Sequence, residues 1–265
     1  MIFQKIKRMF EQRRQREDLY STAGYWDSKA CQLEGNAVSM WPNNALNELY
    51  HREQTALILE ALPSVNSKDL IDLGCGTGRL SRWFAARGAS VIGVDFSKEA
   101  LRIAKHNTVG ENPRYRHLSM FDISDEAKFD ILVSWGSITI ATKNSTELKG
   151  LMAALHRALR PGGDALLLEP IHHGFLHRVL DMNVKEFTQI MKTEGFDIQF
   201  IKPLHFWPMR LLLCYFPLPR MVTMPLYSLG QAIMKIPFFN TMGDYYAIYA
   251  VRRKHGKCEL NKQED

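Results

Sequence analysis

The chain has 265 residues, of which 46% are hydrophobic and 23% are charged, and its formal net charge is +6. These values lie near globular averages, and the length suits one α/β domain with additions. No apolar run reaches the roughly eighteen residues that a membrane-spanning helix needs. The four cysteines lack the C-x-x-C spacing of a zinc site or redox motif. The sequence therefore argues against a spanning helix, a disulfide framework and a metal site, and it predicts a protein of the reducing cytoplasm.

Residues 1–66 are predicted to form a helical N-terminal cap. Within residues 1–18, six basic side chains stand against three acidic ones, and apolar residues recur at near-helical spacing. Such a segment suits an anionic membrane surface, which would place the protein peripherally on the inner face of the membrane. A solvated tail or a lid helix over a cofactor explains the pattern equally well. Further along, Leu46–Leu62 has helical apolar spacing and is closed by Pro63.

A glycine-rich loop follows the first predicted strand. The strand, residues 69–73, runs into glycines at positions 74, 76 and 78, and a helix pattern starts at Arg79. Glycine lets the backbone turn sharply and approach a ligand, and the helix start offers free N–H groups. A second strand, residues 90–95, ends on Asp95, where a carboxylate accepts hydrogen bonds from ribose hydroxyls. This layout predicts a nucleoside-cofactor site in a doubly wound α/β domain.

The glycine spacing distinguishes between nucleoside cofactors. A dinucleotide site needs G-x-G-x-x-G, and the third glycine would fall on Arg79, which disfavours an NAD-dependent oxidoreductase. Asp72 instead lies two residues before Gly74, the first of the three glycines. This pattern resembles motif I of the class I S-adenosylmethionine (SAM) methyltransferases, and the segment ending in Asp95 is similar to their acidic second motif.

The resemblance implies which residues contact SAM. In that family the loop wraps the sulfonium and amino-acid end, the second-strand acid holds the ribose, and an acid after the third strand lies near the adenine. The tip of the fourth strand borders the methyl group, and an N-terminal aromatic segment covers the cofactor. The implied cofactor-binding residues here are Tyr20, Trp26, Asp72, Gly74, Cys75, Gly76, Gly78, Asp95, Phe96, Phe121, Asp122, Ser134 and Trp135.

The remaining elements fit a Rossmann-like, seven-stranded, mostly parallel sheet. Strands are predicted near residues 114–118, 129–134 and 164–169, with a Pro-Gly-Gly turn at 161–163. A helix is expected over Val184–Glu194, ended by Gly195. Two last strands, Phe196–Ile201 and Tyr245–Val251, would complete the sheet as its final hairpin.

An apolar insertion separates those two strands. Pro203–Asn240 contains three basic residues, no acidic residue, and 23 apolar residues out of 38. We interpret it as a helical lid that also forms an apolar wall for a lipophilic acceptor. The predicted organisation is a cap (1–66), a SAM-binding core (67–202), the insertion (203–240), and a final strand with its tail (241–265).

Three histidines are candidate catalytic bases. His172 and His173 follow the fifth strand, at the sheet edge where doubly wound proteins bind ligands, and His51 lies on the cap helix. A histidine there titrates near neutral pH and accepts a phenol or carboxyl proton. Helix capping or solvent exposure is the alternative role for each of them.

The sequence thus predicts a SAM-dependent methyltransferase that modifies an oxygen or carbon atom of a small, lipophilic or carrier-tethered molecule. It is most similar to the quinone, polyketide and malonyl-carrier-protein methyltransferases, with a weaker similarity to enzymes of aryl polyene pathways. A non-catalytic SAM-binding regulator is the alternative. An RNA methyltransferase is a lesser one, because no aromatic stacking set accompanies the basic residues and the fourth strand lacks an Asn/Asp-Pro-Pro-Tyr motif.

Overall fold

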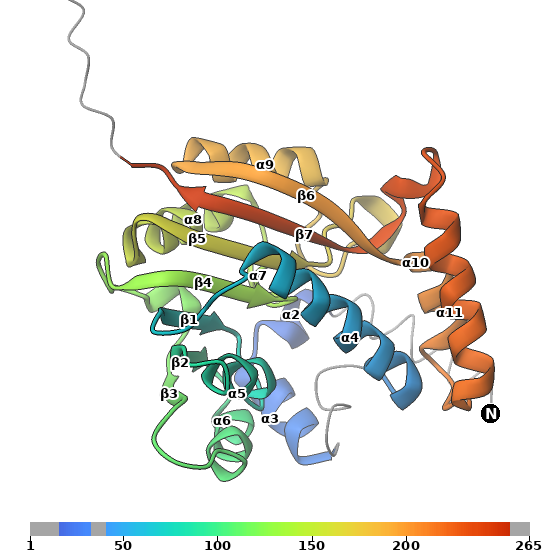
Figure 1. Cartoon of the computed structure of the whole chain (residues 1–265), viewed down its shortest axis with the longest axis horizontal. Coiled ribbons are helices and arrows are strands. Elements are labelled where there is room, and N and C mark those ends of the chain that lie inside the picture. Colours follow the sequence, from blue (N-terminus) through green and yellow to red (C-terminus); the bar gives the residue numbers. More distant parts are fainter. Residues whose placement is uncertain (1–15, 33–40, 255–265) are drawn as a thin grey trace, which may run out of the picture.

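A seven-stranded sheet with strand order β3-β2-β1-β4-β5-β7-β6 lies at the centre of the protein (Figure 1). The computed structural model describes residues 16–32 and 41–254. Strands β1 to β5 are parallel, and β7 runs antiparallel between β5 and β6. The strands are β1 Asp69–Leu73, β2 Ser90–Asp95, β3 Arg114–His117, β4 Phe129–Trp135, β5 Leu159–Glu169, β6 Phe196–Phe206 and β7 Gly243–Arg252. The predicted Rossmann-like sheet with a final hairpin is confirmed.

Helices bury apolar side chains on both faces of the sheet. On one face, α4 (Asn44–Ala61) and α5 (Arg79–Ala85) share an apolar cluster with β1 and β4. On the other, α8 (Ser145–Ala158) and α9 (Val184–Thr193) form the largest cluster. Asparagine caps begin three of these helices: Asn43 accepts from the backbone N–H of Leu46, Asn144 from those of Thr146 and Glu147, and Asn183 forms a capping box with Glu186.

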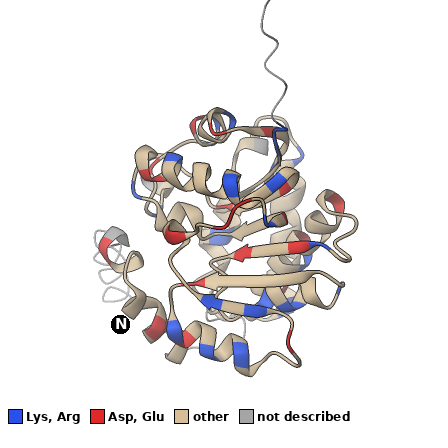
Figure 2. Ribbon diagram, turned by 90° about the vertical axis from the view of Figure 1, so that its left-hand side faces the viewer, with Lys and Arg blue, Asp and Glu red and all other residues tan. Residues whose placement is uncertain are grey.

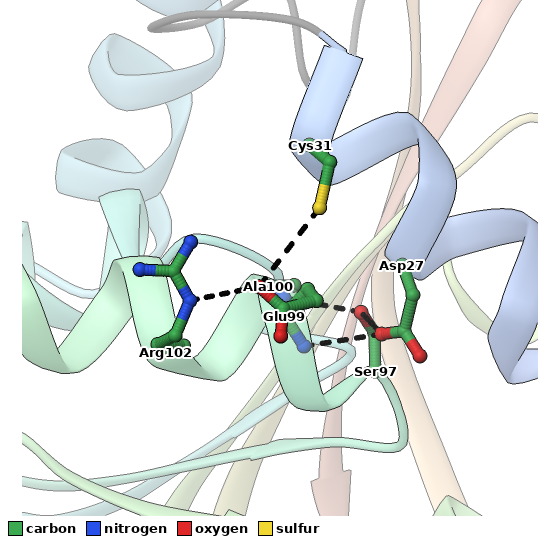
Figure 3. Close-up of polar contacts among 6 residues, drawn as sticks. All are labelled: Asp27, Cys31, Ser97, Glu99, Ala100 and Arg102. Atoms are coloured by element: carbon green, nitrogen blue, oxygen red, sulfur yellow. Dashed lines mark hydrogen bonds and ion pairs between the residues drawn. The ribbon is translucent and has the colours of Figure 1, made fainter.

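The N-terminal helices α2 (Arg16–Tyr20) and α3 (Ala23–Gln32) lie beside the strand ends (Figure 1). Asp27 on α3 holds the start of α6 (Lys98–His106): it accepts from Ser97 Oγ at 2.6 Å and from the backbone N–H of Glu99 at 3.1 Å (Figure 3). Ser97 in turn caps α6 by accepting from the N–H of Ala100 at 3.1 Å. A carboxylate at a helix N-terminus is favoured by the free N–H groups there. Asp27 therefore fixes α3 next to the tip of β2.

The insertion between β6 and β7 comprises α10 (Trp207–Leu213), α11 (Arg220–Met234) and a short 3-10 turn, Phe239–Thr241. Its boundary differs from the predicted residue 203, because β6 continues through Pro203 to Phe206. β6 is an edge strand, where a proline is tolerated, and Pro203 pairs with Tyr246. Strand β5 likewise starts earlier than predicted, at Leu159, and absorbs the Pro-Gly-Gly segment at a register shift against β4.

The insertion and helix α4 share one apolar cluster. Figure 1 shows α10 and α11 stacked at one end of the sheet, with α4 alongside. The cluster is formed by Leu46, Leu49, Tyr50, Leu213, Cys214, Tyr227 and Tyr245. The cap helix and the insertion are therefore packed as one layer, although about 150 residues separate them in the chain.

The amphipathic pattern predicted for the N-terminus falls mainly on residues 1–15, outside the described residues. On the side of the molecule shown in Figure 2, basic and acidic residues are intermixed along the helices and strand ends. Across residues 16–32 and 41–254, none of the helices combines the length and apolar character needed to cross a bilayer.

Candidate cofactor and acceptor site

A cavity of about 840 Å³ opens at the carboxyl ends of the parallel strands. Its lining includes the loop after β1, the tips of β2 and β4, helices α2 and α3, and the first helix of the insertion. The strands of a doubly wound sheet place their following loops at this edge, so residues distant in sequence meet here.

The glycine loop supplies a close backbone approach. Gly74 has φ +62°, and a Cβ on it would lie 2.4 Å from the Cβ of Ser137, so only glycine fits between the two loops. Gly76 has φ +53° and lines the cavity, and a Cβ there would meet no protein atom within 4 Å. The open space at Gly76 therefore belongs to the cavity, and an added methyl group would occupy it.

Asp95 presents its carboxylate at the end of β2. One oxygen accepts from the N–H of Gly76 and the other from the N–H of Ser97, both at 2.8 Å. Burial raises the pKa of Asp95, while these N–H donors oppose the shift. Each carboxylate oxygen keeps a further lone pair, and Asp95 lines the cavity. This arrangement suits recognition of a pair of hydroxyl groups.

Asp72 fixes the loop from below. It accepts from Ser81 Oγ at 2.6 Å, and burial raises the pKa of Asp72 to about 6. Ser81 belongs to α5, so the bond ties the helix that follows the loop to the strand that precedes it.

Glu169 organises the loop after β4. This fully buried carboxylate accepts from the Oγ of Ser134, from the backbone N–H groups of Ser137, Ile138 and Thr139, and from Thr139 Oγ1. The distances run from 2.6 to 3.2 Å. Glu169 thus holds the segment that faces Gly74 in one conformation.

Aromatic residues of α2 and α3 cover one side of the cavity. Tyr20 and Trp26 both line it, their ring centroids lie 5.6 Å apart, and Trp26 Nε1 donates to the carbonyl of Tyr20 at 2.9 Å. Tyr25 completes the cluster at 5.2 Å from each of the two rings. Phe96, Phe121 and Trp135 add further aromatic surface to the lining.

Residues 70–163 match the family described as a methyltransferase domain. This stretch contains the glycine loop, Asp95 and the loop after β4. Residues 70–163 are thus similar to the methyltransferase domain of the class I, SAM-dependent family.

Two curated relatives are similar to part of this chain, and one solved structure shares its fold. Malonyl-[acyl-carrier protein] O-methyltransferase of Pseudescherichia vulneris is 30% identical over 112 residues, covering 42% of this chain and 43% of the relative. Ubiquinone biosynthesis O-methyltransferase of Dechloromonas aromatica is 31% identical over 108 residues, covering 39% and 45%. The alignments thus span less than half of these relatives. A SAM-dependent methyltransferase from Mesorhizobium loti shares the fold, with a TM-score of 0.54, 18% identity, and coverage of 74% of this chain and 96% of that one.

The cofactor of this family is SAM, and the residues present fit it. A buried carboxylate suited to a ribose diol lies beside a glycine loop with open space, under an aromatic lid. The family resemblance implied thirteen cofactor-binding residues, and ten of them line the cavity. They are Tyr20, Trp26, Asp72, Gly74, Cys75, Gly76, Asp95, Phe96, Phe121 and Trp135.

Three other implied residues lie outside the lining. Gly78 precedes α5 as its N-cap, and a Cβ on it would lie 2.3 Å from Tyr115 Oη. Glycine is therefore needed here so that the Tyr115 side chain can pack against the backbone. Asp122 is exposed to solvent, and its neighbours Ser119, Met120 and Phe121 face the cavity instead. Ser134 is buried and donates to Glu169.

None of the three predicted histidines lines the cavity. His172 is buried, and its Nε2 lies 2.9 Å from the backbone oxygen of Asp244. His173 is 72% exposed and pairs with Asp181 at 2.9 Å, because adjacent residues on extended backbone point to opposite sides. His51 contacts Arg79, and burial together with that guanidinium lowers the pKa of His51 to about 4.

The lining also contains residues that the sequence analysis did not identify. Apolar and aromatic side chains come from the cap, the β5–α9 segment, the insertion and β7. Cations come from several elements, including α3, α5 and α10. Among the apolar and aromatic members are Trp41, Leu176, Leu211, Tyr215 and Tyr245, and the charged members include Lys29, Arg79, Lys143, Glu147, Arg178 and Arg210.

A buried ion-pair cluster supports this second part of the cavity. Arg210 Nε lies 2.7 Å from Asp244 Oδ1, and Tyr50 Oη donates to the other oxygen of Asp244 at 3.4 Å. Burial alone would raise the pKa of Asp244, but Arg210, His172 and Arg178 together hold it below its usual value. His172 thus has a structural role: it contacts Asp244, which pairs with Arg210 in the cavity wall.

Proposed function

We propose that the protein is a SAM-dependent methyltransferase that transfers a methyl group to an oxygen or carbon atom of a small, lipophilic or carrier-tethered acceptor. The observation that carries the proposal is the continuity of the cavity: the glycine loop and Asp95 share one space with the apolar side chains of Leu176, Leu211 and Tyr215. The named relatives, which are O-methyltransferases of a malonyl carrier protein and of ubiquinone biosynthesis, support an oxygen acceptor.

Bound SAM supplies an electrophilic methyl group, so the protein chiefly needs to orient the acceptor toward that group and to exclude water from the site. Asp95 and the glycine loop hold the nucleoside, and Glu169 keeps the loop after β4 in place beside them. Tyr20 and Trp26 cover the site and offer aromatic faces to a positive charge. The apolar residues of the insertion keep the acceptor end dry.

Ligand protection tests this function directly. S-adenosylhomocysteine (SAH) at 100 times its Kd should stabilise the protein by about 2.7 kcal/mol, which raises the melting temperature by several degrees. NADH at about 1 mM should give no shift. A folded protein that SAH does not stabilise would contradict the proposal, and stabilisation without methyl transfer to any acceptor would favour the non-catalytic regulator.

We also propose that the insertion contacts a membrane surface peripherally, where a lipophilic acceptor would be found. Large apolar side chains of α10, α11 and the following turn are exposed, and residues 203–240 contain basic but no acidic residues. Exposed apolar side chains next to basic ones suit an anionic lipid interface. The most exposed of them are Phe216 at 61%, Met221 at 88% and Phe238 at 79%.

Co-sedimentation with vesicles containing phosphatidylglycerol tests this contact. Phe238→Ser together with Met221→Ser should lower the bound fraction several-fold relative to the full-length wild type. Val109→Ser changes an even more exposed apolar residue, on the loop after α6; it is the control and should sediment as wild type does. Equal sedimentation of all three proteins would remove the insertion from any membrane contact.

A further inference from the structure

Two cations from different elements border the same cavity. Arg178 comes from the segment between β5 and α9, and Lys29 comes from α3. Arg178 is enclosed by protein yet keeps accessible surface, because it faces the cavity. Buried cations normally pair with carboxylates, so the partners of these two need to be identified.

The partners that Arg178 and Lys29 have are aromatic. Arg178 Nη1 lies 3.4 Å from Tyr245 Oη, and its guanidinium carbon lies 5.4 Å from the centroid of that ring. Lys29 Nζ lies 5.1 Å from the Trp26 ring centroid. Among the side chains that the structure describes in residues 18–32 and 41–254, no carboxylate oxygen lies within 4.0 Å of either cation.

The one buried carboxylate that acts on Arg178 is already engaged. Asp244 forms its ion pair with Arg210 at 2.7 Å, and His172 Nε2 lies 3.7 Å from the same oxygen. The single negative charge of Asp244 thus interacts with two guanidinium groups, those of Arg210 and Arg178. Around Asp244, positive charge is therefore in excess.

Arg178 and Lys29 also repel each other. Burial and the charge of Arg178 lower the pKa of Lys29 to about 8. Two like charges held in a partly desolvated space are stabilised when an anion binds between them. Apolar side chains such as Leu176 and Leu211 line the same cavity, so the anion would carry an apolar body.

We infer that Arg178 and Lys29 form a subsite that binds an anionic group, a carboxylate or a phosphate, on the methyl acceptor. This inference rests on the proposed function, because it names the acceptor class of that site. The amino-acid carboxylate of SAM is the second possible source of such an anion. Arg79, which directly follows the glycine loop and also lines the cavity, offers that carboxylate a cation of its own.

A pair of fluorescent probes tests the subsite in the presence of saturating SAH. The first is 8-anilino-1-naphthalenesulfonate, an apolar ring system with an anionic group, and the second is N-phenyl-1-naphthylamine, the same ring system without the anion. Wild type should bind the anionic probe more tightly. Arg178→Met should weaken the anionic probe about tenfold to a hundredfold and leave the neutral probe nearly unchanged.

The matched control is Arg87→Met, which removes the same charge from an exposed position outside the cavity lining. It should bind both probes as wild type does. Arg178→Lys keeps the charge and should recover part of the affinity for the anionic probe, which separates a binding role from a folding defect. Lys29→Met should reduce anionic-probe binding by less than Arg178→Met.

The cofactor arm uses SAH and 5′-methylthioadenosine, which lacks the amino-acid carboxylate. If Arg178→Met weakens SAH but not methylthioadenosine, the subsite serves the cofactor and the acceptor assignment is overturned. A wild type that binds both probes equally, or an Arg178→Met variant with unchanged preference, also overturns it. Failure of wild type to bind SAH at all would instead contradict the proposed function.

Discussion

The two ends of the cavity are built in different ways. The cofactor end comes mainly from residues 72–96, where a strand, a loop, a helix and a second strand follow one another in the chain. The acceptor end combines Lys29 of α3, Trp41 before α4, Arg178 after β5, Leu211 of α10 and Tyr245 of β7. A site assembled from neighbouring segments leaves a motif in the sequence, whereas one assembled across some 200 residues does not.

The two ends also differ in charge. All five charged residues line the cavity, and we assign Asp72 and Asp95 to the proposed cofactor end and Lys29, Arg178 and Arg210 to the proposed acceptor end. We expect variants of the two carboxylates to affect the cofactor, and variants of the cations to affect the acceptor. The following predictions test that division.

The largest effect is expected for Asp95→Asn. The change removes the charge that accepts hydrogen bonds from the loop and that, in our proposal, accepts them from a ribose diol; hydrogen bonds to charged groups contribute about 1.5–3 kcal/mol each. SAH affinity, measured by calorimetry, should fall about a hundredfold. Asp122→Asn, at an exposed position outside the lining, should change SAH affinity less than threefold or so. Equal losses in the two variants would mean that the carboxyl group of Asp122 reaches the cofactor.

The second effect concerns stability. Glu169→Ala leaves the buried N–H groups of Ser137, Ile138 and Thr139 without their acceptor, so the free energy of unfolding should fall by about 3–5 kcal/mol. Urea denaturation measures the loss. Glu60→Ala, which removes an exposed partner of Lys202, should change stability by no more than about 1 kcal/mol. A small effect of Glu169→Ala would show that the loop after β4 is held by other contacts.

A smaller effect is the pH dependence of anion binding. Lys29 has a lowered pKa of about 8 because it is buried and faces the cation Arg178, so it loses its proton as the pH rises through that value. The affinity of 8-anilino-1-naphthalenesulfonate, whose sulfonate stays ionised, should therefore fall several-fold between pH 7 and 9. The Lys29→Met profile should be flat over this range. A wild-type profile that is equally flat would exclude Lys29 from the subsite.

The smallest effect is expected at the contact between α3 and α6. Asp27→Asn weakens the bonds from Ser97 and Glu99 that hold α3 beside Asp95 (Figure 3), and SAH affinity should fall about threefold. Arg102→Ala removes only an exposed ion pair with Glu99 on the same helix and should leave SAH affinity unchanged. Identical affinities for the two variants would mean that α3 does not shape the cofactor end.

The same division explains how much the sequence revealed. The loop from Gly74 to Gly78, the acid at Asp95 and the strand pattern predicted the sheet and most of the cofactor lining, because glycine spacing and strand length are local properties. His172 and His173 were placed at the correct edge of the sheet, but which way each ring points depends on Asp244 and Asp181, and contacts of this kind leave no local pattern.

Arg178 shows the opposite case. It follows His173 by five residues in a segment without regular spacing, and its importance appears only when Tyr245, from the last strand, lies against it. Pro203 shows why the insertion boundary shifted: a proline normally ends a strand, but an edge strand accepts it. Tertiary context decided both positions.

Incubation of cell extract with the purified protein and methyl-deuterated SAM, followed by mass spectrometry, tests the central claim most directly. The account predicts a new species that is heavier by about 17 Da (CD3 replacing H) and keeps an acidic group on the scaffold or carrier that bears the methyl. A free lipophilic product should extract into organic solvent, whereas a carrier-tethered one should stay with the protein. The species should be absent with Asp95→Asn. A protein that binds SAH but labels nothing in the extract or on carrier-protein conjugates would contradict methyl transfer, and labelled RNA would contradict the small-molecule acceptor.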